Sequence, residues 1–102
     1  MRKIVHFDIK DEYRQLQDTL FSWEEVEGKE DWEFIFFVAD SYVRMHIIDE
    51  IEEFLLRNPV KSSKIREGRN EMYPLNDDST IVCYANADER VPENILTVLM
   101  SL

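Results

Sequence analysis

The sequence is poor in the residues that form long loops and covalent cross-links. It has two glycines, three prolines and one cysteine in 102 residues. The single cysteine, Cys83, excludes a disulfide within the chain and a zinc site built from several thiolates. A glycine-rich loop that could cradle phosphate groups is also missing. We therefore expect short connections, no metal site and no cofactor.

Long apolar runs are missing as well. No stretch approaches the roughly 20 apolar residues that a transmembrane helix needs. The first fifteen residues, MRKIVHFDIKDEYRQ, lack the apolar core of a secretory signal peptide. Together with the lone cysteine, these features predict a cytoplasmic protein that does not associate with a membrane.

Positive charge is scarce. Twelve lysines and arginines stand against 22 acidic residues, which gives a formal net charge of −10. A field of that sign repels nucleic-acid phosphates and attracts cations, so nucleic acid is disfavoured as a partner and a basic protein is favoured. The hydrophobic share of 44% and the aromatic share of 12% indicate a folded chain rather than an acidic disordered one. The length predicts a single α/β domain over residues 1–102.

Hydrophobic periodicity predicts most of the elements. Alternation of apolar residues is typical of strands, and apolar residues three and four apart are typical of helices. These patterns predict strands at residues 3–9, 32–39 and 80–85 and helices at residues 41–57 and 92–102. Residues 32–39 (WEFIFFVA) are apolar on both faces, so this strand should be central and covered on both sides. Asp40 or Ser41 should cap the helix at 41–57, and Pro59 should prevent its continuation.

The end of the first helix is ambiguous. The helix begins after Asp11, and it either runs to Val26 and ends at Gly28 or stops near Phe21. In the second case Ser22–Val26 pairs with residues 32–39 as a hairpin, an arrangement that we prefer because its glycine lies in the turn. The element order is then βαββαβ, the ferredoxin-like split βαβ fold, with both helices on one face of the sheet.

The final helix has apolar residues around most of its circumference, so it should be buried. In a ferredoxin-like sheet one face is left open by the two main helices. An apolar open face needs a cover, and either this C-terminal helix or a second copy of the chain could provide it. A homodimeric structural module is therefore one alternative for this protein.

The acidic residues are concentrated in residues 22–34, SWEEVEGKEDWEF. This segment holds six carboxylates and one lysine, a net charge of −5, between two tryptophans. Charge next to aromatic anchors is the composition of many binding hot spots. In a hairpin the two indole rings could lie close together, and a partner's cation could then contact a ring and a carboxylate at once.

We therefore predict a protein-binding module, rather than an enzyme, that neutralises a basic partner. By analogy of charge alone, immunity proteins, antitoxins and nucleic-acid mimics act in this way on basic nucleases or toxin domains. The predicted binding residues are Trp23, Glu24, Glu25, Glu27, Glu30, Asp31 and Trp32. A basic segment, KSSKIREGR at 61–69, is expected to be a loop that pairs with the chain's own acidic surface, stays mobile or contacts phosphate.

Two enzymatic alternatives involve His6 and Asp8. HFDI at 6–9 and DDSTIVCY at 77–84 resemble, over about a dozen positions, the small CRISPR-associated integration subunits and virulence-associated ribonucleases. That resemblance implies a ferredoxin-like, metal-dependent ribonuclease acting through Asp8, although the arginine-rich first helix of the CRISPR subunits is missing. Separately, His6 and Asp8 share a strand face, and a nearby Cys83 would complete a Cys-His-Asp nucleophile site.

Overall fold

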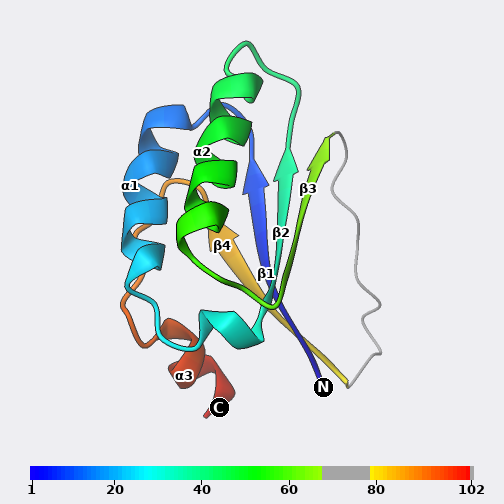
Figure 1. The fold of residues 1–102 in the computed structure, drawn as a ribbon, viewed down its shortest axis with the longest axis vertical. Coiled ribbons are helices and arrows are strands. Elements are labelled where there is room, and N and C mark those ends of the chain that lie inside the picture. Colours follow the sequence, from blue (N-terminus) through cyan, green and yellow to red (C-terminus); the bar gives the residue numbers. More distant parts are fainter. Residues whose placement is uncertain (68–78, 102) are drawn as a thin grey trace.

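A computed structural model describes residues 1–67 and 79–101 and shows helices packed on a parallel sheet (Figure 1). Its elements are β1 (Arg2–Ile9), α1 (Tyr13–Glu24), the 3-10 turn η1 (Lys29–Asp31), β2 (Glu33–Val38), α2 (Arg44–Arg57), β3 (Ser62–Glu67), β4 (Thr80–Asn86) and α3 (Ile95–Met100). The four described strands lie in the order β3-β2-β1-β4, and all three pairings are parallel.

The ferredoxin-like prediction is wrong, because a ferredoxin-like sheet is antiparallel. The error begins at the predicted hairpin. Ser22 and Trp23 belong to α1, so no strand lies between α1 and β2. Since α1 links β1 to β2, and α2 links β2 to β3, each connection is long enough to return the chain to the same end of the sheet. Strands joined in this way run parallel.

Burial of Trp23 explains why α1 continues past Phe21. Leu16, Leu20 and Trp23 follow one another at spacings of four and three residues, and all three are buried. The Trp23 ring lies 5.6 Å from both the Phe7 and the Phe34 rings, in edge-on geometry. A large indole buried in this way contributes both area and specific ring contacts to the core, which favours helix over hairpin here.

The remaining elements follow the predicted patterns in part. The prediction of a central strand is confirmed, because β2 pairs with β1 on one side and β3 on the other. Strand β4 is also where it was expected. By contrast, the predicted basic loop contains β3, whose only partly buried side chain is that of Ile65. Gly68 and Arg69, the last two residues of the predicted loop, lie outside the described residues.

Both long helices cover the same face of the sheet (Figure 1). The core on that face joins apolar side chains of α1 and α2 to Val5, Phe7, Phe34 and Phe36 of the central strands. A smaller cluster on the other face contains Ile4, Ile35 and Phe37, with Val82 packed against it. The sheet is therefore apolar on both faces, as parallel sheets generally are.

The two helix-end predictions need correction. Residue Val43 occupies the N-cap of α2 and makes no side-chain cap bond, so neither Asp40 nor Ser41 has the predicted role. Helix α3 is only partly buried: Leu96 is enclosed, whereas Val98 and Met100 are exposed. Its buried residue joins the core on the helix side, so α3 is not the expected cover of the other face. No helix within residues 1–67 and 79–101 combines the length and apolar character needed to cross a membrane.

Candidate functional site

The two tryptophans of the acidic segment are core residues. Trp23 is fully buried, and Trp32 is 2% exposed. Neither ring can present its face to a partner, so the predicted pairing of a partner's cation with an exposed indole is wrong. The two rings instead anchor the segment at both ends, with α1 before it and β2 after it.

The carboxylates between the anchors are exposed. Glu25, Glu27, Glu30 and Asp31 all face solvent, and none of them forms an ion pair with another described residue. Glu24 differs, because it is partly buried and lies 2.9 Å from the Arg57 guanidinium of α2. Four of the five predicted acidic binding residues are therefore available to a partner, and the fifth is engaged within the fold.

Backbone contacts hold this segment in one shape. Gly28 adopts a left-handed conformation, with φ of 82°, and turns the chain into η1. The ammonium group of Lys29 donates hydrogen bonds to the carbonyl oxygens of Glu24 (3.0 Å) and Val26 (3.3 Å). The segment's one cation therefore satisfies the end of α1, where free carbonyls attract positive charge, and is not paired with a carboxylate.

A fifth exposed acid comes from a distant part of the chain. The backbone N–H of Glu27 donates to the carbonyl oxygen of Glu93, at 2.9 Å, which brings the approach to α3 against the acidic segment. We call Glu25, Glu27, Glu30, Asp31 and Glu93 the acidic pole. It lies at the end of the sheet where the strands begin, beside α3 (Figure 1). Nothing in the local sequence around Glu93 indicated this placement.

The acidic pole contains a hollow of about 230 Å³. Glu27 and Asp31 contribute carboxylates to its lining, and Trp32, Leu96 and Met100 contribute apolar atoms. The ammonium group of Lys3, another lining residue, lies 5.9 Å from the centre of the Trp32 ring. Because Lys3 already occupies the ring face, the carboxylates rather than the indole are the groups that the hollow offers to a cation.

The charge of Glu33 is compensated mainly by Arg2 of β1 and only weakly by the basic segment. Glu33, the last acid of the predicted segment, accepts hydrogen bonds from Arg2 at 2.8 and 3.2 Å. This bond lowers the pKa of the Glu33 carboxyl, and the charges of Lys61 and Lys64 lower it further. Among the described residues, Arg2, Lys61 and Lys64 form no ion pair with the acidic pole.

Asp8, the residue through which the ribonuclease alternative would act, lies at the other end of the sheet. Asp77 and Asp78 of the segment that carried the resemblance lie outside the described residues. Asp8 is exposed near the end of β1 and is aligned with Asn86 of β4. Within residues 1–67 and 79–101, no group of three histidine, cysteine or carboxylate side chains is placed so that it could hold a metal ion. Since the sheet is parallel, the ferredoxin-like fold on which this alternative was based is also missing.

The Cys-His-Asp alternative fails on geometry. Cys83 is aligned with Val5 and packs in the core on the helix side. His6 is aligned with Tyr84 and points to the opposite face, where its ring stacks on Phe37. Burial also raises the pKa of the Cys83 thiol, which disfavours the reactive thiolate. The sheet itself therefore separates the cysteine from the histidine.

A second hollow, which the sequence analysis did not identify, lies where β1 and β2 lead into α1 and α2. It measures about 440 Å³ and is lined by Asp11, Tyr13, Arg14, Gln15, Tyr42, Val43 and His46. Polar side chains just after the ends of parallel strands are the available sequence signal for such a site. That signal could be read only after the strands were known to be parallel.

Comparisons with protein-family models, with curated proteins and with solved structures found no match to this chain.

Proposed function

We propose that this protein binds a basic protein surface through the acidic pole. The observation that carries the proposal is a group of five exposed carboxylates, from two separate parts of the chain, without a cation paired to them among the described residues. Mutual repulsion of these groups destabilises the free protein, and a basic partner would relieve it. The net charge of −10 would also accelerate the encounter.

Preorganisation supports binding at this place rather than mere solubility. Two buried indoles, the bonds of Lys29 and the contact with Glu93 hold the carboxylates on a defined frame. A surface that is ordered before binding loses less conformational entropy when the partner arrives. In this proposal the tryptophans position the charges and do not contact the partner.

Covering a basic surface would inhibit a partner that uses the same surface to bind nucleic acid. This is the immunity-protein or antitoxin role, and we include it in the proposal as the consequence of binding. The basic surface would then belong to a nuclease or a toxin domain.

The test compares two variants with equal net charge. The pole variant carries Glu27→Gln, Glu30→Gln and Asp31→Asn. The control variant carries Asp49→Asn, Glu52→Gln and Asp88→Asn, which alter exposed carboxylates outside the pole. Fluorescence anisotropy measures the Kd of a labelled decalysine peptide for each protein at several NaCl concentrations.

The pole variant should bind about tenfold more weakly than the parent, because three contacts of about 0.5 kcal/mol each amount to about 1.5 kcal/mol, and about 1.4 kcal/mol corresponds to a factor of ten. Its affinity should also depend less on salt. The control variant should lose no more than about threefold, which is the effect of general charge alone. Equal losses in both variants would contradict the docking role, since net charge and not the pole would then govern binding.

A further inference from the structure

The hollow between the starts of α1 and α2 has a lining that the acidic pole does not explain. It lies at the opposite end of the sheet, beyond the final residues of β1 and β2. In parallel α/β sheets this is the end at which ligands bind, because side chains from several loops and helix starts meet there. A volume of about 440 Å³ is within the range of small-molecule pockets.

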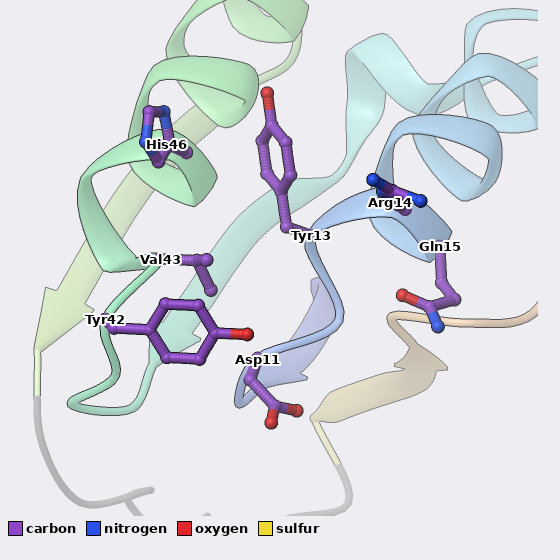
Figure 2. Close-up of a pocket in the computed structure, with 7 residues that line it drawn as sticks. All are labelled: Asp11, Tyr13, Arg14, Gln15, Tyr42, Val43 and His46. Atoms are coloured by element: carbon purple, nitrogen blue, oxygen red, sulfur yellow. The ribbon is translucent and has the colours of Figure 1, made fainter.

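Three rings form one side of this hollow. Tyr13 is half-buried against the core, and its ring lies 5.5 Å from the His46 ring of α2. Tyr42, from the connection before α2, is 91% exposed. Figure 2 shows the Tyr42 hydroxyl directed towards the side on which Asp11 lies. The exposed Tyr42 ring and the half-buried Tyr13 ring both line the hollow, and each offers a surface on which a planar group can stack.

The lining of the hollow holds one acid, Asp11, and one arginine, Arg14, which lie apart from each other (Figure 2), so a cationic group can pair with the acid on its own side of the hollow. Asp11 contributes a carboxylate to the lining, and the Glu12 carboxylate accepts a hydrogen bond from the Lys10 N–H at the start of α1, at 2.8 Å. These two acids occupy the positive end of the helix, which would otherwise attract an anion. Arg14, the cation of the lining, lies on the far side of Tyr13 from Val43 and Tyr42 (Figure 2).

We propose that this hollow binds a planar guanidinium group. Such a group stacks on tyrosine rings and pairs with a carboxylate through two parallel N–H donors, which an ammonium ion cannot do. Tyr42 and Tyr13 supply the stacking surface, Asp11 supplies the carboxylate, and Val43 contacts the alkyl stem. The ligand is either a free guanidino compound or an arginine side chain of a protein, because both carry the same group.

The test is a titration of ¹⁵N-labelled protein with N-acetyl-L-arginine amide, followed by NMR. Amide shifts should change around Asp11, Tyr42 and His46, with a Kd on the order of millimolar for so small a ligand. N-acetyl-L-lysine amide has the same charge without the planar group, and it should bind at least about fivefold more weakly. Asp11→Asn and Tyr42→Ala should each weaken arginine-amide binding by about fivefold or more.

Matched controls are Asp88→Asn and Tyr84→Ala, which alter another exposed carboxylate and another exposed tyrosine outside the hollow. They should change the Kd by less than about twofold. The proposal is overturned by shifts that do not localise to the hollow, by equal binding of the lysine amide, or by unchanged binding in Asp11→Asn and Tyr42→Ala. Asp11→Asn and Tyr42→Ala leave the acidic pole unchanged, so either proposal can be refuted without the other.

A capped Gly-Arg-Gly peptide distinguishes the two sources of the ligand. Binding about tenfold tighter than that of the arginine amide supports an arginine within a protein chain, because the flanking backbone then adds contacts. Binding that is equal or weaker supports a free guanidino compound. In both cases, binding of the peptide should be weakened by Asp11→Asn and by Tyr42→Ala, as binding of the arginine amide is.

Discussion

At the scale of single residues, His6 shows how burial changes a titratable side chain. Its ring is 2% exposed and lies 4.8 Å from the Phe37 ring and 5.2 Å from the Tyr84 ring. Loss of solvent lowers the pKa of His6, and the negative charge of Asp8 opposes this in part. The folded protein therefore favours the neutral imidazole.

This lowered pKa predicts a loss of stability in acid. The pKa of His6 in the unfolded chain is near 6.5, and the folded value is lower. As the pH falls, the unfolded chain therefore binds a proton at His6 before the folded protein does. The contribution of neutral, buried His6 to the free energy of unfolding is fully present above pH 6.5 and is lost as the pH falls through the folded pKa. His6→Phe keeps a ring on Phe37 but removes the titration. Urea unfolding should show a smaller loss of stability between pH 7.5 and 5 for His6→Phe than for the parent.

His46 provides the control for this experiment, because it is the other histidine and is exposed. The same substitution at this position, His46→Phe, leaves His6 in place, so its loss of stability in acid should exceed that of His6→Phe. If His6→Phe lost as much stability in acid as the parent does, burial of His6 would not be the cause.

At the scale of elements, the connection between α1 and β2 determines how the acidic pole is presented. Its turn depends on Gly28, the only described residue with a positive φ. A Cβ at this position would meet no other atom within 4 Å. Any cost of a side chain here therefore comes from the backbone conformation and not from a collision.

Replacing Gly28 should test this backbone requirement. Gly28→Ala should lower the free energy of unfolding by about 1–2 kcal/mol, because a residue with a Cβ is disfavoured in the left-handed region. Gly28→Asn should lose less, since asparagine tolerates that conformation better than alanine does. Urea unfolding measures both. Equal stability of the parent and Gly28→Ala would show that the turn readily adopts another conformation.

At the scale of the whole molecule, charge and apolar burial oppose each other. The net charge of −10 acts on a chain whose sheet has an apolar cluster on each face. Like charges in a compact state repel, and the repulsion is strongest where carboxylates are close together and unpaired. The acidic pole is such a place.

Added salt, or neutralisation of carboxylates by mutation, should therefore stabilise the protein. At 20 mM NaCl the pole variant with Glu27→Gln, Glu30→Gln and Asp31→Asn should gain about 1 kcal/mol, which raises Tm by about 4–8 °C. At 500 mM NaCl the Debye length falls below about 5 Å, so the gain should shrink. The control variant with Asp49→Asn, Glu52→Gln and Asp88→Asn should gain less, because its carboxylates are dispersed. Thermal unfolding followed by circular dichroism measures Tm, and equal gains in the two variants would show that the pole carries no special repulsion.

The candidate sites were predictable from the sequence only in part. The concentration of acid in residues 22–34 is a local property, and Glu25, Glu27, Glu30 and Asp31 are exposed as a charged segment should be. The role of the tryptophans was not predictable, because a hairpin and a helix place Trp23 in different environments. Glu93 joins the pole through a contact between residues 66 positions apart, and no local pattern indicates such a pairing.

The sequence by itself determined the locally encoded elements. The stripe of α2, the alternation of β1 and the apolar run of β2 each reflect neighbours within a few residues, as does the acidic charge. Only the tertiary structure decided the direction of the strands and the location of β3. The direction of a strand depends on the whole connection that precedes it. The edge strand β3 turns only Ile65 towards the core, so its sequence lacks the alternation that predicts a strand. The tertiary structure also decided the composition of the two proposed binding surfaces, because residues distant in the chain meet there only after the sheet has formed.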